Sequence, residues 1–168
     1  MPIRAGARAS SAGFWNPALE WMVTMRIAEI LRNKGSAVMT ARPDLDIRAL
    51  LALLAEHNIG AVVVSPDGRR IAGIVSERDI VRALNRHGAA LLDSPVSRIM
   101  STEVRVCAPE DHVEGLRRVM TEHRVRHLPV VSGGELAGIV SIGDVVKSAI
   151  SELATEREQL VEYLQGGY

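Results

Sequence analysis

Hydrophobic positions along the chain predict short strands that alternate with amphipathic helices. Four apolar residues fall at i, i+3, i+4 and i+7, the stripe of a helix with one buried face: Ile47, Leu50, Leu51 and Leu54. Two β-branched runs, residues 61–64 and 71–75, flank a Pro-Asp-Gly turn and predict a hairpin. A short strand is expected over residues 38–40, and a second helix is expected to start at Ser76. The predicted order is therefore β-α-β-β-α.

The same order of elements is written twice. Pro43 matches Pro109, an offset of 66 residues (109 − 43), and Gly73 matches Gly138, an offset of 65 (138 − 73). The single lost residue falls in the Gly-rich hairpin turn, where a duplication tolerates a length change. A chance match would not keep register on both sides of that turn, so the chain contains an internal repeat.

Two small repeats imply one paired module. A unit of about 60 residues buries too little surface to be stably folded alone, so we expect the copies to pack face to face and share one core. The predicted fold class is α/β (α+β), with two β-α-β-β-α repeats related by pseudo-twofold symmetry. The predicted organisation is an N-terminal extension 1–24, repeats 25–88 and 89–150, and a C-terminal helix 151–168.

Composition narrows the function classes. Apolar residues make up 47% of the chain but aromatics only 3%, so the core must be aliphatic. Twenty basic residues balance 20 acidic ones, which gives no electrostatic argument for a nucleic-acid or membrane partner. No uncharged apolar stretch reaches the roughly 18 residues needed to span a bilayer. The lone cysteine, Cys107, fits a reducing compartment, and we expect a cytoplasmic protein.

Residues 1–24 have a composition of their own. They contain Arg4 and Arg8 and no acidic residue before Glu20. A basic, Ser-rich and acid-poor leader is typical of a transit peptide, which would place the protein in the mitochondrion. The alternative is an extension unrelated to the fold, with the working start near Met25.

A seven-residue motif carries the candidate chemistry. Gly-Ile-Val-Ser-Glu-Arg-Asp at 73–79 recurs as Gly-Ile-Val-Ser-Ile-Gly-Asp at 138–144. One interpretation is structural, because Ser-x-x-Asp before an apolar run is a capping box. The other is a ligand site, because a helix N-terminus attracts anions and a carboxylate accepts hydrogen bonds from paired ribose hydroxyls. A hydroxyl, a carboxylate and a helix N-terminus together suit a nucleoside phosphate.

With this doubled motif, and with the strand 127–130 (His-Leu-Pro-Val) that leads to the second copy, the chain resembles a tandem CBS-domain pair, or Bateman module, over residues 26–150. The resemblance implies two clefts between the copies that bind an adenosine compound: AMP, ADP, ATP, NAD or S-adenosylmethionine. It also implies a regulatory ligand in place of a required cofactor, and a disc-like homodimer.

The resemblance assigns ligand-binding roles by position. Asp79 and Asp144 would hold ribose hydroxyls, and Ser76 and Ser141 would bond ribose or phosphate. Thr40 and Val106 would line the adenine pocket. The approaches to the base and the phosphates would be lined by residues at the two strand starts: Gly60, Ala61, Val62, Arg126, His127 and Leu128. Arg78 belongs to the same set, but the matching residue of the second repeat is Gly143, so the two clefts should differ.

Basic residues at the second strand start have two interpretations. Arg124, Arg126 and His127 would meet phosphates in a cleft, since arginine is a good bidentate phosphate partner, or they would form a solvated turn. His123 and His127 are four apart, but one ends a helix and the other opens a strand. They share no face, and no cysteine or carboxylate completes a metal site, so no metal is expected.

No catalytic signature is found: no Ser-His-Asp set, paired carboxylates or Gly-rich phosphate loop. The leading prediction is therefore a binding module that is not an enzyme and that acts through its own dimer or on an unidentified regulated protein. Two alternatives stay open, a nucleotide-hydrolysing enzyme and a structural dimerisation module with vestigial clefts.

The apolar spacing in the C-terminal tail predicts a further helix over residues 147–165. Val146, Leu153 and Leu160 are seven apart, which makes a short apolar stripe. The stripe would pack on the chain's own core or on a second subunit. Apolar residues beyond one stripe on the helix near residue 50 also favour a homodimer: Ala49, Ala52, Leu53 and Ala55.

Overall fold

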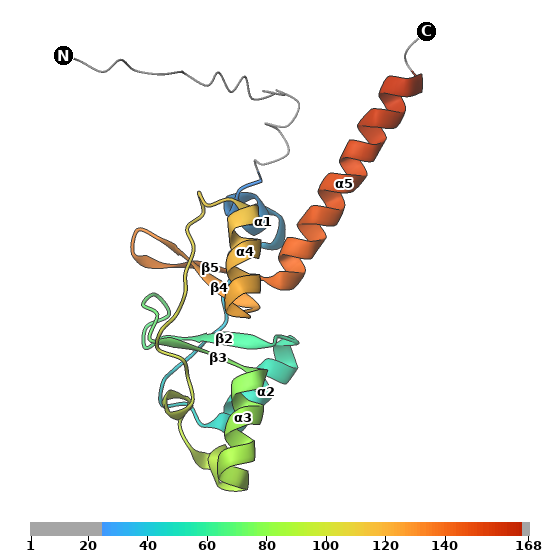
Figure 1. Cartoon of the computed structure of the whole chain (residues 1–168). Helices are drawn as coiled ribbons and strands as arrows, with labels where there is room; N and C mark the ends of the chain where they lie inside the picture. Colours follow the sequence, from blue (N-terminus) through green and yellow to red (C-terminus); the bar gives the residue numbers. More distant parts are fainter. Residues whose placement is uncertain (1–24, 166–168) are drawn as a thin grey trace, which may run out of the picture.

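The structure is a computed structural model that describes residues 25–165, and it consists of two halves stacked one above the other (Figure 1). The interpretation of residues 1–24 as a leader lies outside the described residues. The lower half contains β1 (Thr40–Ala41), α2 (Ile47–His57), β2 (Ala61–Val64), β3 (Gly73–Ser76) and α3 (Glu77–His87). The upper half contains α4 (Val113–His123), β4 (His127–Ser132), β5 (Glu135–Ser141) and α5 (Ile142–Gln165), preceded in the chain by α1 (Ile27–Lys34). Two 3₁₀ segments, η3 (Gly88–Asp93) and η4 (Val96–Arg98), connect the halves.

The matching helices α2 and α4 end in the same backbone conformation, and a side-chain cap marks the start of α2. Asp46 caps α2, because its Oδ1 accepts a hydrogen bond of 2.7 Å from the backbone N–H of Ala49. α2 ends at Asn58 with φ 50°, and α4 ends at the matching Arg124 with φ 53°. A left-handed residue at both helix ends satisfies the last carbonyls in the same way and turns the chain into the next strand. The duplication is thus preserved in backbone conformation as well as in sequence.

The two sheets keep the same register but not the same size. In the first, β2 pairs in parallel with β1 and antiparallel with β3. The second holds the antiparallel pair β4 and β5 together with one parallel bridge between Cys107 and Val130, which matches the pairing of Ala41 with Val64. The first predicted strand is therefore displaced from 38–40 to β1, and its counterpart in the second repeat is shortened to this bridge.

The expectation of one shared core is wrong. Buried hydrophobic residues form two separate clusters, one around Leu50 and Val62 in the lower half and one around Leu128 and Val140 in the upper half. Each sheet is covered by its own helices, so each half closes its own core. Three further buried apolar residues belong to neither cluster: Ala61, Val63 and Pro129.

Two segments pack on the half opposite to the one that their place in the sequence predicts. Ile27 and Ile30 of α1 are buried in the core of the second half, whereas Leu91 and Val96 of the connecting segment are buried in the core of the first. Each core therefore contains residues from both sides of the predicted boundary between 25–88 and 89–150. That boundary stays a prediction from the sequence duplication. No helix between residues 25 and 165 is long and apolar enough to cross a membrane.

Candidate functional site

Both Ser-x-x-Asp motifs form capping boxes. Asp79 Oδ2 accepts hydrogen bonds from the backbone N–H of Ser76 at 2.8 Å and from its hydroxyl at 2.6 Å. The matching distances from Ser141 to Asp144 Oδ2 are 2.7 and 2.9 Å. The structural interpretation of the motif is therefore confirmed.

Capping leaves half of each carboxylate available. Every hydrogen bond that Asp79 receives from the described residues goes to Oδ2. Among those residues no buried side-chain oxygen or nitrogen lacks a partner, so Asp79 Oδ1 reaches solvent. One oxygen can cap α3 while the other accepts a hydroxyl from a ligand, and the two interpretations of the motif are compatible.

The second carboxylate carries a third bond. Lys34 Nζ lies 2.6 Å from Asp144 Oδ2, which brings the C-terminal turn of α1 onto the start of α5. Burial acts to raise the pKa of Asp144, but the hydrogen bonds from Lys34 and Ser141 outweigh it and hold that pKa below its ordinary value. Asp144 is thus an ion-paired carboxylate.

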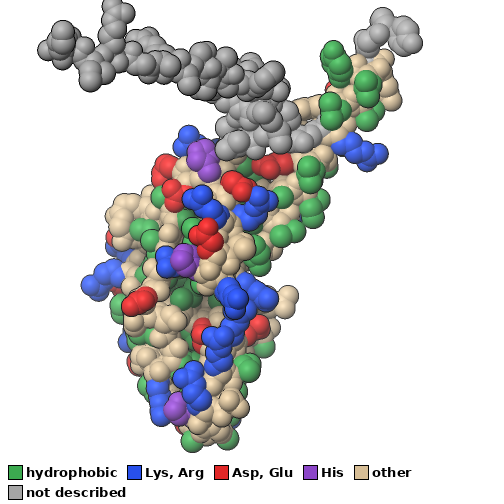
Figure 2. Space-filling view, viewed as in Figure 1, with side chains coloured by type: hydrophobic (Ala, Val, Ile, Leu, Met, Phe, Trp, Pro, Cys, Tyr) green, Lys and Arg blue, Asp and Glu red, His purple; other side chains and the backbone are tan. Residues whose placement is uncertain are grey.

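A cleft of about 500 Å³ lies between α3 and the end of α4. Four arginines line it together with four uncharged residues: Arg78, Arg82, Arg124 and Arg126, with Met120, Thr121, Val125 and Ile142. Figure 2 shows basic side chains gathered near the junction of the two halves. Arg78 reaches across it, because its Nη1 donates a 3.2 Å hydrogen bond to the carbonyl of Arg124. None of the described residues that line this cleft carries a carboxylate, so its guanidinium groups are placed to bind an anion.

The four arginines have almost no basic counterparts at the positions that the pseudo-twofold axis relates to them. The offset of 65 matches Arg78 with Gly143 and Arg82 with Lys147, and the offset of 66 matches the arginines of the second repeat with Asn58 and Gly60. Four cations on one side therefore correspond to one on the other. The cleft also adjoins both motifs in the chain, since Arg78 directly precedes Asp79 and Ile142 directly follows Ser141.

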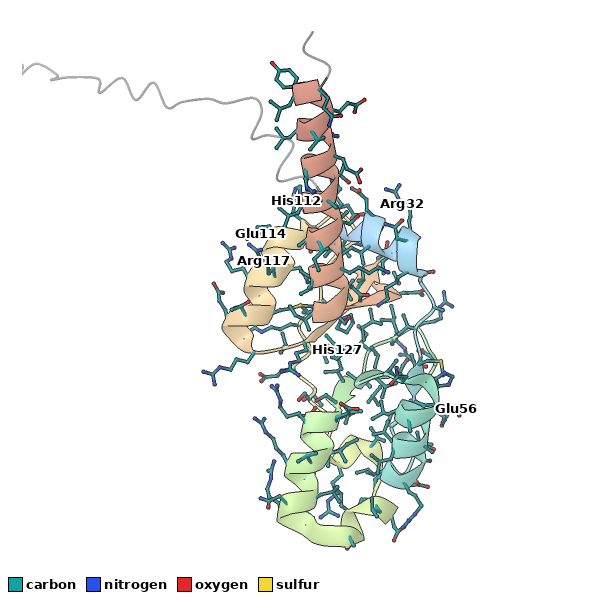
Figure 3. The ribbon with its side chains drawn as sticks, turned by 90° about the vertical axis from the view of Figure 1, so that its right-hand side faces the viewer. Arg32, Glu56, His112, Glu114, Arg117 and His127 are labelled. Carbon is teal, nitrogen blue, oxygen red and sulfur yellow. The ribbon has the colours of Figure 1, made fainter. Side chains whose placement is uncertain are left out.

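The two strand starts meet at the centre of the molecule. A Cβ atom added to Gly60 would lie 3.4 Å from Glu77 Oε2 and 3.6 Å from His127 Cε1, so the first repeat approaches the second closely here. In Figure 3 the labelled His127 lies at the junction of the two halves. Burial lowers the pKa of His127, and the nearby charge of Lys34 lowers it further, while the carboxylates of Asp144 and Glu77 partly oppose them. A neutral imidazole therefore faces the junction at pH 7.

This lowered pKa predicts a pH-dependent stability. Below pH 6.5, the ordinary value for histidine, the unfolded chain binds a proton that the folded chain resists. The contribution of His127 is complete above pH 6.5 and is lost as the pH falls toward the lower folded pKa, at no more than about 1.4 kcal/mol per pH unit. Urea unfolding at several pH values should show a shallower loss in His127→Gln than in the parent. The exposed His57→Gln is the control, and equal slopes in all three proteins would contradict the assignment.

The structure brings some of the predicted site residues together and separates others. Arg78 and Arg126 line one cleft, and Gly60 contacts the region of His127. Thr40 is half-buried in β1, whereas Val106 is 50% exposed. Three others have side chains buried in or beside the cores, which leaves only backbone atoms for a ligand: Ala61, Val62 and Leu128.

Several residues of the region were not predicted, among them Arg82 and Lys34. Arg82 lies one helical turn after Arg78, and this i, i+4 spacing was a usable signal. Lys34 is 110 residues from Asp144 in sequence, and no local pattern could have paired them. Within residues 25–165 no group of three or more side chains is arranged to hold a metal ion.

Two β-α-β-β-α repeats with an arginine-lined cleft between α3 and the end of α4 define a tandem-repeat α/β module. The CBS domain model matches this chain twice, at residues 27–86 and 96–151, and the chain belongs to the CBS-domain family. The predicted fold class and the predicted family are therefore confirmed.

Relatives and solved structures agree with this assignment. The chain is 33% identical over 150 residues to the mitochondrial CBS domain-containing protein CBSX3 of Arabidopsis thaliana, covering 84% of this chain and 73% of that protein. A crystal structure of the CBS-domain containing protein ATU1752 from Agrobacterium tumefaciens is 43% identical, with a TM-score of 0.72, covering 74% of this chain and 99% of that one. The CBS domain pair of protein MJ0100, solved with 5′-methylthioadenosine and S-adenosyl-L-methionine, is 22% identical with a TM-score of 0.67, covering 76% and 98%.

Proposed function

We propose that this chain is a regulatory module that binds an adenine nucleotide between its two repeats. The observation that carries the proposal is the cleft of about 500 Å³ whose charged side chains are four arginines and which adjoins both Ser-x-x-Asp motifs. The adenosine ligands of the MJ0100 domain pair support the same ligand class. Arginines concentrated in one cleft favour AMP, ADP, ATP or NAD, which carry phosphate, over the cationic S-adenosylmethionine.

Each part of the nucleotide has a proposed partner. The free Oδ1 of Asp79 accepts ribose hydroxyls, and Ser76 bonds ribose or phosphate. Asp144 and Ser141 are the matching pair of the second motif. Arg78 and Arg126, with their neighbours in the cleft, hold the phosphates. Backbone groups line the base and its approaches, because the side chains at several of these positions are buried or apolar: Thr40, Gly60, Ala61, Val62, Val106 and Leu128.

The proposed role is sensing, with no chemical step. Hydrolysis of a phosphate ester needs a positioned general base or a metal-activated water. The cleft lining supplies arginines and uncharged groups and neither of these parts. Turnover of ATP or NAD by the purified protein would favour the hydrolase alternative, and indifference to every ligand would favour the structural dimerisation module.

We infer that the output passes through a homodimer or to a separate protein. The exposed face of α5 carries apolar residues that are 51–64% exposed: Val146, Ile150, Leu153 and Leu160. Figure 1 shows that α5 extends well beyond the body of the molecule. A stripe this exposed on a projecting helix is suited to burial against a second copy, because twofold association would cover it on both chains.

The proposed compartment is a reducing one, the cytoplasm or the mitochondrion. The single cysteine, Cys107, is buried, and burial raises the pKa of its thiol to about 12, which keeps it unreactive. The mitochondrial name of the Arabidopsis relative supports the second compartment.

Nucleotide should raise the melting temperature, since a ligand that bridges the two repeats binds only the folded state. At a free concentration near 100 times its dissociation constant, the gain in unfolding free energy is about 2.7 kcal/mol. Thermal melts of the full chain with AMP, ADP, ATP, NAD and S-adenosylmethionine test this, and guanosine triphosphate controls for charge alone. A melting temperature that no compound changes at millimolar concentration would contradict the proposal.

A further inference from the structure

The ion pair between Lys34 and Asp144 separates the two motifs chemically. Asp144 Oδ2 accepts three donors, two from Ser141 and one from the ammonium group of Lys34 at 2.6 Å. Both partners are partly withdrawn from solvent, with side-chain exposures of 34% and 20%. The charge of the second carboxylate is therefore neutralised inside the protein.

The first motif has no such partner in the described part of the chain. Asp79 Oδ2 receives bonds only from Ser76. Met100 lies beside Gly73, where its sulfur would be 2.8 Å from an added Cβ atom, just as Leu31 lies beside the matching Gly138. The ammonium group of Lys34 is therefore an addition of the second motif, and Asp79 bonds no cation among the described residues.

Packing fixes the position of the Lys34 ammonium group. α1 is anchored by Ile27 and Ile30, which are buried in the second core. Leu31 packs against Gly138, where an added Cβ atom would lie 2.7 Å from Leu31 Cδ2. Because the helix is held along its length, the ion pair needs little further ordering of the backbone.

We propose that Lys34 closes the second motif to ligand, so that the module binds one nucleotide, at the first motif. This inference rests on the proposed function and deepens it. A ribose hydroxyl is a neutral donor, and at Asp144 it would meet a carboxylate whose charge Lys34 already compensates at Oδ2, whereas Asp79 offers an uncompensated charge. The four-arginine cleft, which has only Lys147 at its matched positions, adds phosphate affinity on one side alone.

Isothermal titration calorimetry with ATP on the full chain tests the inference. We expect the parent protein to bind one equivalent. In Lys34→Met the stoichiometry should rise from one equivalent to two, and the double variant Lys34→Met, Asp144→Ala should return to one. Arg32→Met is the matched control on the same helix, and it should keep one equivalent (Figure 3 shows Arg32 on α1).

Three results would overturn the inference. They are two equivalents of similar affinity in the parent, one unchanged equivalent in Lys34→Met, and a second equivalent in Lys34→Met that survives loss of Asp144. Circular dichroism of each variant checks that it is folded, and Lys34→Gln provides a second variant if the methionine form is unstable. A failure of the proposed function looks different, because ATP would then give no binding heat with any of these proteins.

Discussion

Replacing Arg124 and Arg126 together by glutamate is expected to weaken ATP binding by at least 100-fold. The two residues line the cleft opposite Arg78 and Arg82. A charge-assisted hydrogen bond from arginine to phosphate contributes about 1.5–3 kcal/mol, so the loss of two costs about 3–6 kcal/mol, and each 1.4 kcal/mol is a factor of ten. Repulsion from the introduced carboxylates adds to this loss. Calorimetric titration with ATP measures the effect.

A matched pair on the same repeat separates local contact from overall charge. Arg117 and Arg118 lie on α4 outside the cleft, where they form ion pairs with Glu114 and Glu122. Their replacement by glutamate changes the net charge equally and should alter ATP affinity less than threefold at 0.15 M salt, since exposed charges are screened beyond about 8 Å. Equal losses in the two double variants would mean that the cleft does not contact the phosphates.

The full chain is expected to be a dimer that Leu153→Glu with Leu160→Glu converts to a monomer. These leucines are 64% and 63% exposed, and with Val146 they form a stripe of seven-residue spacing along α5. Two buried leucines contribute about 1.5–3 kcal/mol each, and each chain of a symmetric pair contributes both, so charges placed there remove most of the association energy. Light scattering at micromolar concentration should report about twice the 18.2 kDa chain mass for the parent and one chain mass for the variant.

Ser151→Glu with Thr155→Glu controls for added charge on the same helix. Both positions are exposed and lie off the stripe, so this variant should stay dimeric. A parent protein that has the mass of a monomer both with and without ATP would contradict the role given to α5. It would also leave a separate partner protein as the route for any signal.

Much of the fold could be predicted because its signals are local and repeated. The hydrophobic stripe of α2 and the β-branched runs of β2 and β3 follow from spacing alone, and duplication supported each assignment twice. The separation of the cores could not be predicted. Periodicity identifies the buried face of an element but not which neighbour covers it, and α1 packs on the repeat that lies further along the chain.

The candidate site was predictable in its chemistry and only partly in its geometry. The Ser-x-x-Asp motif identified Asp79 and Asp144, but sequence could not show that one oxygen caps while the other stays free. The gathering of Arg82 with Arg124 depends on how α3 faces α4. The pairing of Lys34 with Asp144 depends on the path of α1, and contacts between distant segments leave no pattern in a single sequence.

Titration of ATP into the parent protein and into Asp79→Ala tests the central claim most directly. The claim is that the first motif binds ribose in addition to capping α3. We expect a 1:1 complex with the parent and an affinity at least tenfold lower in Asp79→Ala, with about 1 kcal/mol of unfolding free energy lost through the cap. Full affinity in Asp79→Ala, together with a lowered melting temperature, would contradict the account and leave the carboxylate with the capping role alone.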